Sequence, residues 1–228
     1  MKIGGLMKLT LLDYPEKVAC TVFTVGCNLK CPFCHNATLV QNRDCQDFSE
    51  EEILAFLKKR KNVLEGMCLT GGEPLIHDVA PFLKKVKDLD YLVKLDTNGF
   101  FPDKLQALVQ NGLVDYVAMD IKNSLDCYSQ TVGKQVDTTA VKKSVAYLKS
   151  NVVPYEFRTT VTGNYHNEES ILAMGKWLKS DSKMFLQKFV DSGDLLDNTT
   201  FGVDDETMER YREILLPYLP NTQLRGIK

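Results

Sequence analysis

The sequence lacks any long hydrophobic run: no apolar stretch approaches the ~20 residues that span a bilayer, so we expect no membrane helix. Its formal net charge is only −2, which provides no bulk attraction to nucleic acid or to a membrane surface. Residues 1–17 contain no long apolar core and no small-residue cleavage site, so no signal peptide is expected. These absences predict a cytoplasmic protein without a nucleic-acid or membrane partner.

Linkers rich in proline or serine, internal repeats and low-complexity tracts are also missing, so residues 1–228 are expected to form one domain. The chain has seven cysteines. In a cytoplasmic protein these cysteines are not expected to form a disulfide framework. Clustered cysteines there more often bind metal or take part in catalysis. Three of them, Cys27, Cys31 and Cys34, lie close together in the segment "GCNLKCPFCHN" (26–36).

Short apolar strands alternate with amphipathic helices along the chain. Strands are predicted at 18–24, 67–70, 91–96, 114–120, 155–163 and 184–190, and helices after Ser49 and at 80–89, 102–112, 138–150, 167–180 and 204–219. This alternation predicts βαβ crossovers and a parallel sheet. Six such units fit an α/β sheet curled into part of a barrel, although a flat doubly wound sheet has the same periodicity.

Parallel α/β sheets place their sites beyond the carboxyl ends of the strands. The predicted strands end in or carry a coherent polar set. The first four end in the cysteine loop, "TGGEP" (70–74), "DTNG" (96–99) and "DIK" (120–122), the fifth carries Arg158, and the sixth carries Gln187 and Lys188. We therefore expect one site that combines thiolates, carboxylates, an amide and cations.

The cysteine loop has two interpretations. Three thiolates can hold three irons of a [4Fe–4S] cluster and leave the fourth iron open to a ligand that is not protein. A structural zinc site instead has about four protein ligands, and here His35 or Cys45 would have to complete it. The C-x3-C-x2-C spacing favours the cluster, because closing a tetrahedron from the same short loop is difficult.

Together these motifs resemble the radical S-adenosylmethionine (SAM) superfamily over nearly the whole chain. The resemblance rests on Cys27, Cys31, Phe33 and Cys34, on "GGEP" at 71–74, and on the six-unit layout. Within the superfamily, "CHN" (34–36), "DTNG" and "DIK" resemble the glycyl-radical-enzyme activating group, typified by pyruvate formate-lyase activating enzyme. Residues 9–36 are similar to the longer form of the activating proteins of anaerobic ribonucleoside-triphosphate reductase.

The resemblance implies a single-domain partial (β/α)6 barrel of radical SAM type, with its cluster loop at 26–36 and a last helix at about 204–219. It implies a [4Fe–4S] cluster that cleaves SAM reductively to methionine and a 5′-deoxyadenosyl radical, which takes a hydrogen atom from a glycine of the partner. The implied partner is a glycyl-radical enzyme, in the first place the anaerobic reductase, with flavodoxin or ferredoxin as electron donor. Two alternatives stay open: a radical SAM enzyme that acts directly on a small molecule, and a non-catalytic zinc-binding scaffold.

The resemblance assigns roles to individual residues by their positions in the matching motifs. The resemblance makes Cys27, Cys31 and Cys34 the cluster ligands, and it places Phe33, Asn36, Gly71, Gly72, Glu73, Asp96, Thr97, Asn98, Asp120, Lys122, Arg158 and Gln187 around SAM. Among these, Gly71 to Glu73 match the amino-group site, and Gln187 stands where the lyase activator has histidine. In that activator the counterparts of Asp96, Thr97 and Asp120, with a carbonyl near Ala118, also hold a monovalent cation.

The chain also departs from the family pattern. Family members often carry "DGPG" where this sequence has "DYPE" (13–16), and no ferredoxin-like insertion is present, so no auxiliary cluster is expected. Cys20 and Cys68 fall in apolar strands and are predicted to be core residues, while Cys45 and Cys127 are dispersed. Structural or surface roles are expected for His77 and His166, and Trp177 is expected in the core.

Overall fold

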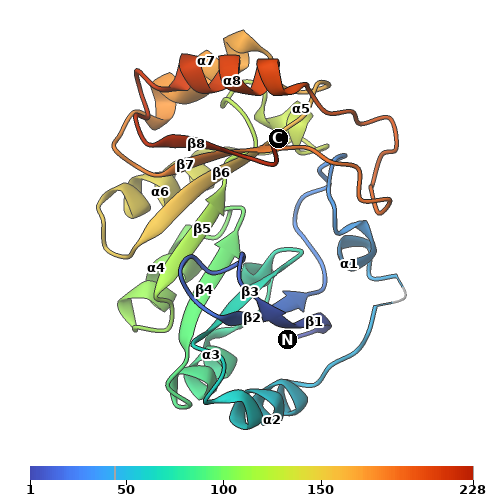
Figure 1. The fold of residues 1–228 in the computed structure, drawn as a ribbon, viewed down its shortest axis with the longest axis vertical. Helices are drawn as coiled ribbons and strands as arrows, with labels where there is room; N and C mark the ends of the chain where they lie inside the picture. The colour runs from blue at the N-terminus through green and yellow to red at the C-terminus, as the bar shows by residue number, and fades with distance from the viewer. Residues whose placement is uncertain (44, 228) are drawn as a thin grey trace.

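The strands follow one another in space in the order in which they occur in the chain. In the computed structural model, which describes residues 1–43 and 45–227, eight strands form one sheet in the order β1 to β8 (Figure 1). Their bounds are β1 Ile3–Thr10, β2 Ala19–Thr24, β3 Gly66–Gly71, β4 Leu92–Thr97, β5 Tyr116–Asp120, β6 Tyr155–Val161, β7 Met184–Lys188 and β8 Thr222–Arg225. β1 is antiparallel to β2, and all later neighbours are parallel.

The helices alternate with these strands. They are α1 Ala37–Gln41, α2 Glu50–Arg60, the 3-10 turn η1 Pro74–Ile76, α3 Ala80–Lys87, α4 Pro102–Gln110, α5 Tyr128–Thr131, α6 Thr139–Lys149, α7 Glu168–Leu178 and α8 Asp205–Leu215. Local sequence explains several ends. Ser49 and Glu52 form the predicted capping box of α2, and Gly112 has a left-handed φ of 66° just after α4.

The six predicted strands and their crossover helices are confirmed, and two further strands extend the sheet. β1 was missed because it is an edge strand with two glycines and three exposed residues, so it lacks the apolar signal of a buried strand. β8 has only four residues. Both lie at the ends of the sheet, so the order of the predicted strands between them is unchanged.

The two faces of the sheet differ in character. Alternate residues such as Val22, Leu69 and Leu95 have no solvent exposure and belong to the hydrophobic core. Their neighbours on the other face are polar over the same strands: Thr21, Cys68, Thr70, Lys94, Asp96, Tyr116, Asp120, Glu156, Arg158 and Thr160. Period-two alternation of this kind places one set under the helices and the other set on the inner face.

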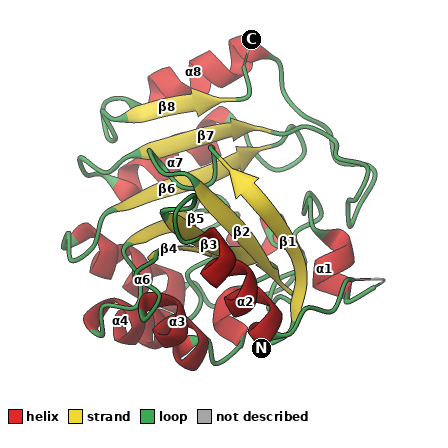
Figure 2. Cartoon of the chain, turned by 60° about the horizontal axis from the view of Figure 1, so that its bottom comes forward, coloured by secondary structure: helices red, strands yellow, loops and turns green. Residues whose placement is uncertain are grey.

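The helices therefore cover one side of the sheet (Figures 1 and 2), with α4 against α6 and α7 against α8. A doubly wound sheet would have helices on both faces, whereas the inner face of this sheet carries the polar set and only a small apolar cluster of Tyr14, Ala19, Leu92 and Tyr116. The fold is the predicted curled α/β sheet, an open partial barrel. No helix in the described part of the chain is long and apolar enough to cross a membrane.

One core prediction needs correction. Cys20 lies in the hydrophobic core as expected, and Trp177 packs against it. Cys68 is fully buried, but it lies on the polar inner face, where its Sγ is 3.8 Å from Lys94 Nζ and 3.6 Å from Asp96 Oδ1. The apolar residues around it in sequence concealed this, because Cys68 points to the opposite face from Met67 and Leu69.

Candidate functional site

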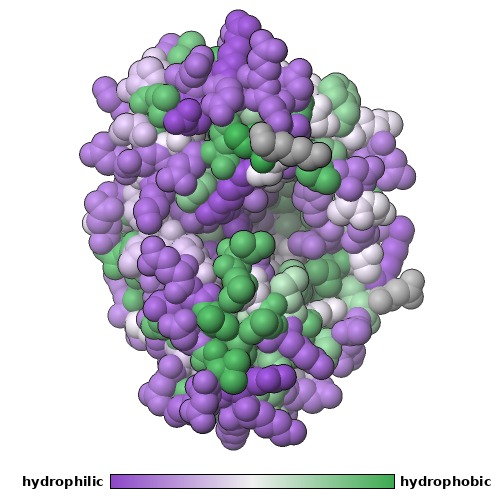
Figure 3. Space-filling model, in the orientation of Figure 1, coloured by the Kyte–Doolittle hydropathy of each residue, from purple (hydrophilic) through white to green (hydrophobic). Residues whose placement is uncertain are grey.

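A cavity of about 440 Å³ opens at the carboxyl ends of the strands, and Figure 3 shows the molecule hollowed at the centre of this face. All the residues that the resemblance assigned to the cluster and SAM line it: Cys27, Cys31, Phe33, Cys34, Asn36, Gly71, Gly72, Glu73, Asp96, Thr97, Asn98, Asp120, Lys122, Arg158 and Gln187. Lys188, which belonged to the predicted polar set, does not line the cavity and is paired with Asp205. Residues from five strands, β3 to β7, and the loop after β2 thus converge, as the parallel topology requires.

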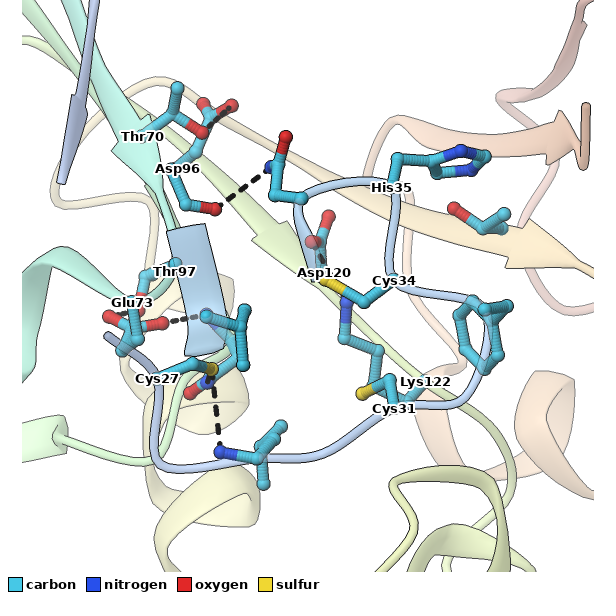
Figure 4. A pocket seen from close by; sticks show the side chains of 18 of the residues that line it. Cys27, Cys31, Cys34, His35, Thr70, Glu73, Asp96, Thr97, Asp120 and Lys122 are labelled. Carbon is cyan, nitrogen blue, oxygen red and sulfur yellow. Dashed lines mark hydrogen bonds and ion pairs between the residues drawn. The ribbon is translucent and has the colours of Figure 1, made fainter. Parts of the chain in front are cut away.

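The three cysteines lie at different points of one loop beside this cavity (Figure 4). Cys27 lies beside Glu73 and Thr97, while Cys31 and Cys34 lie near Lys122 and Asp120. The loop is held by backbone bonds, including Cys34 N–H to Cys31 O at 3.0 Å, and Leu29 N–H donates to Cys27 Sγ at 3.3 Å. Burial raises the pKa of Cys27 to about 11, although the Leu29 N–H opposes the shift, so this thiol is neutral without bound metal.

The geometry does not favour a mononuclear zinc site. Within the described residues, no group of three or more His, Cys, Asp or Glu side chains is placed to hold a single metal ion. Both candidate fourth ligands are engaged elsewhere: His35 stacks on Phe189 with ring centroids 5.3 Å apart, and Cys45 Sγ is 3.4 Å from Thr38 O. The three cysteines line the cavity, and cysteine thiolates are the usual ligands of iron–sulfur clusters.

The "GGE" segment is packed directly onto the start of the cysteine loop. Gly72 N–H donates to Thr24 O and Glu73 N–H donates to Gly26 O, each at 2.9 Å. A Cβ on Gly72 would lie 1.9 Å from Gly26 O. Because Gly72 has no side chain, the "GGE" segment can lie directly against Gly26 as well as form part of the cavity wall. The sequence alone did not reveal this contact.

Glu73 is a buried carboxyl with an organised set of donors. Its oxygens accept hydrogen bonds from Thr97 Oγ1 at 2.8 Å, Asn98 N–H at 2.7 Å and Leu75 N–H at 3.1 Å. Burial nevertheless raises its pKa to about 7, since desolvation outweighs these donors. The carboxylate is therefore prepared for a ligand that carries positive charge into the cavity.

A second polar group crosses β4, β5 and β6. Arg158 donates from Nη1 to Asp96 Oδ2 at 3.1 Å and from Nε to Asp120 Oδ1 at 3.0 Å. Lys94 forms an ion pair with the other oxygen of Asp96, and Lys122 Nζ lies 3.0 Å from Asp120 Oδ2. Burial opposes ionisation of Asp120, but Arg158 and Lys122 outweigh it and lower its pKa to about 2.

Two amides tie the cysteine loop to neighbouring strands. Asn98 Nδ2 donates to Asn28 Oδ1 at 2.8 Å and approaches Cys27 Sγ at 3.8 Å, while Asn36 Nδ2 donates to Gly71 O at 3.0 Å. The two histidines have structural roles, as predicted. His77 Nε2 lies 2.8 Å from Val25 O before the loop, and the buried His166 contacts Lys122 O at 2.9 Å.

Asp13, Val40, Thr160 and Leu196 of the cavity wall were not predicted. Leu29, His35 and Thr70 also line it; they lie within the predicted cysteine loop and "TGGEP" segment but had no role in the predicted SAM site. Asp13 comes from the "DYPE" loop and accepts a hydrogen bond from Thr21 Oγ1 at 2.5 Å. Its neighbour Tyr14 is buried against Gly66 and Tyr116. The position of Asp13 depends on β1, which the sequence did not predict, so no sequence signal placed it at the site.

The model of the radical SAM superfamily matches residues 21–178. This chain belongs to the radical SAM superfamily. The matched region contains the three cysteines, the "GGE" segment and the carboxylates of β4 and β5, which are the residues that meet at the cavity.

Relatives within the radical SAM superfamily agree with the group that the motifs indicated. A protein of Methanocaldococcus jannaschii, provisionally named a glycyl-radical enzyme activating enzyme, is 32% identical over 82% of this chain and 79% of its own. The pyruvate formate-lyase-activating enzyme of Clostridium pasteurianum is 27% identical over 58% of each chain. A radical SAM methyltransferase from Sphaerobacter thermophilus shares the fold, with a TM-score of 0.74 and 13% identity, over 95% of this chain and 68% of that one.

Radical SAM proteins carry a [4Fe–4S] cluster and SAM, and the residues around the cavity fit both groups. Thiol donors on one loop face a space rather than a single ion position, and thiolates are the usual ligands of iron–sulfur clusters. The buried Glu73 carboxyl offers a partner for an ammonium group close to Cys27. We conclude that this radical SAM chain can accommodate its family's cofactors at this cavity.

Proposed function

We propose that the chain is a glycyl-radical-enzyme activating enzyme. The observation that supports this most directly is the meeting of Cys27, Cys31 and Cys34 with Glu73 in one cavity, within a chain whose relatives bear the activating-enzyme name. The proposal covers residues 1–228 as one radical SAM core domain, a radical SAM oxidoreductase.

In this proposal Cys27, Cys31 and Cys34 hold three irons of the cluster and leave one iron for SAM. When bound, the cluster supplies the electron that splits SAM and so begins removal of a hydrogen atom from a glycine of the partner. The protein contributes position and exclusion of water, because the cofactors carry the difficult chemistry. Asn98 and Leu29 support this arrangement by fixing Cys27, since both place an N–H group against its sulfur.

The SAM contacts follow from charge and position. Glu73 would bind the ammonium group of the methionine moiety, and Lys122 would bind its carboxylate. Asp96, Thr97, Asn98 and Asp120 are proposed to lie near the ribose, Asn36 near the adenine, and Phe33 against the cofactor. Gly71 and Gly72 shape the wall, and Arg158 reaches the same region from β6. Gln187 on β7 completes the far side, and no specific role is proposed for it.

The proposed partner is the anaerobic ribonucleoside-triphosphate reductase, with flavodoxin or ferredoxin as electron donor. The partner class is supported by the names of the relatives, and the choice of the reductase by the similarity of residues 9–36 to activators of that enzyme. The cavity opens at one end of the sheet and its wall includes Asp13 from the loop after β1. That loop would therefore lie beside a glycine-bearing segment of the partner.

The test is activation of a partner under anaerobic conditions. The protein is reconstituted with iron and sulfide, reduced, and mixed with SAM and the anaerobic reductase of the same host. We expect about four irons per chain and an organic doublet in the electron paramagnetic resonance spectrum of the reductase. Replacing the radical-bearing glycine of the reductase by alanine is the matched control and should abolish the doublet.

Two outcomes would contradict the proposal. SAM cleavage without a doublet on any glycyl-radical enzyme of the host would favour direct action on a small molecule. A single zinc ion per chain, with no response of its spectrum to SAM, would favour the zinc scaffold.

A further inference from the structure

The resemblance implied a monovalent cation held by Asp96, Thr97 and Asp120, and in the structure the guanidinium of Arg158 lies between the two carboxylates. Arg158 is the register neighbour of Asp120 on the adjacent strand. Its Nε lies 3.0 Å from Asp120 Oδ1 and its Nη1 lies 3.1 Å from Asp96 Oδ2. One planar group therefore joins the two carboxylates, which come from β5 and β4.

The remaining carboxylate oxygens are also occupied. Lys94 is paired with Asp96 Oδ1, and Lys122 Nζ lies 3.0 Å from Asp120 Oδ2. The group thus contains three cations and two anions, from residues whose side chains are at most 32% exposed. A further cation between the two carboxylates would have to displace Arg158 from the oxygens that it contacts in this partly buried space. A further implied ligand, Thr97 Oγ1, donates to Glu73.

The strand register explains how Arg158 reaches across β5. Asp96 pairs with Ala118, and Asp120 pairs with Arg158, so these side chains share the inner face. Ala118 carries only a methyl group, so no large side chain stands between the guanidinium and Asp96. Arginine suits this place because its planar fork can bond two carboxylates at once and it stays charged.

We propose that Arg158 is a positioning residue that replaces a monovalent cation between Asp96 and Asp120, so that SAM binding here needs no sodium or potassium. The part of this inference that concerns SAM rests on the proposed function. When Lys122 turns to the SAM carboxylate it leaves Asp120, and Arg158 then keeps Asp120 and Asp96 in place for the ribose.

The first experiment uses the metal-free protein, and it is independent of activity. Thermal unfolding is measured in sodium, potassium and tetramethylammonium chloride at equal ionic strength. Wild type is expected to unfold within about 1 °C in all three salts, because an ion that binds only the folded state would raise its midpoint. A specific rise in sodium or potassium would overturn the proposal, whether or not the chain activates any partner.

Variants supply the converse test. Arg158→Met leaves two carboxylates facing each other, so sodium or potassium should now raise the unfolding midpoint by about 3 °C or more over tetramethylammonium. In the reconstituted enzyme this variant should bind SAM about tenfold more weakly in tetramethylammonium, with partial recovery in potassium. Arg158→Lys keeps a charge and should show little salt preference.

Arg210→Met is the matched control, because Arg210 forms an exposed pair with Glu168 far from the cavity. It should unfold alike in the three salts. If Arg158→Met shows no salt preference while it remains folded, Arg158 does not substitute for a cation. If that variant does not fold, the wild-type and Arg158→Lys measurements still decide the question.

Discussion

The backbone carbonyl of Gly26 accepts a hydrogen bond from Glu73 N–H and fills the space where Gly72 would carry a side chain. Because Gly26 immediately precedes Cys27, the segment that holds the buried carboxyl and the loop that holds the cysteines form one packed unit. The distance between these two sets of residues is therefore fixed by backbone contact.

This contact predicts a severe effect of Gly72→Ala. The new methyl group would lie 1.9 Å from Gly26 O, so the two backbones must separate, and overpacking of this kind costs about 1–3 kcal/mol. We expect a lower unfolding midpoint and loss of stoichiometric iron after reconstitution. The control is Gly5→Ala, because the nearest atoms to a Cβ there belong to Phe23 and lie 3.4 Å or more away. Gly112→Ala is unsuitable as a control because Gly112 has a left-handed φ of 66°.

Glu73 predicts a pH dependence of stability in the metal-free protein. Its pKa is about 7 in the folded chain, against an ordinary value of 4.5, so the folded state binds more protons between these values. Stability should therefore fall as pH rises from 4.5 to 7, by up to about 1.4 kcal/mol per pH unit from this group. Denaturant unfolding of wild type and Glu73→Gln across this range gives the free energy of unfolding of each protein. The wild-type value minus the Glu73→Gln value should decrease as the pH rises.

The same carboxyl predicts the pH dependence of SAM binding, if Glu73 holds the ammonium group as proposed. The ionised form is the better partner, so affinity should rise as pH passes through about 7 and then level off. Calorimetric titration of the reconstituted enzyme with SAM gives this profile. A flat profile in wild type, or an unchanged profile in Glu73→Gln, would exclude the assignment.

The cysteines predict a contrast between two alanine variants. Cys31→Ala removes a proposed ligand and should abolish cluster-dependent cleavage of SAM. Cys127 is the residue before α5 and lies outside the cavity wall, so Cys127→Ala should keep most of the activity. Iron content and methionine release are measured for both proteins. Equal loss in the two variants would contradict the ligand assignment.

The burial of Lys94 beside Asp96 predicts that this lysine stabilises the fold more than a surface lysine does. It is 1% exposed and paired with Asp96, and removing one member of a buried pair costs about 3–5 kcal/mol. Lys94→Met should lose about 3 kcal/mol, toward the lower end because Arg158 still contacts Asp96. Lys61→Met is the matched control, because Lys61 is 52% exposed in its pair with Asp90, and surface pairs contribute about 0–1 kcal/mol. A similar loss in both variants would refute this role.

The sequence located the site because its signals are local. The cysteines, Glu73, Asp96 and Asp120 each follow a strand with a strong apolar pattern, and parallel topology brings such positions to one edge. What was missed depends on contacts between distant segments. Lys94 and Asp96 are two residues apart on β4 and so share a face, but only the register with β3 puts Lys94 beside Cys68.

β1 and β8, which the sequence did not predict, are the two end strands of the sheet. An eight-stranded sheet that closes has an interior just wide enough for its own side chains. In the described residues no ladder joins β1 to β8: β1 pairs with β2 and forms one bridge to Phe48, and β8 pairs with β7. The segment after β7 is instead bonded to the segment after β2, because Asp194 accepts from Thr38 N–H and Asp197 N–H donates to Pro32 O. These two segments, and not a strand ladder, therefore join the two halves of the open sheet at its carboxyl end.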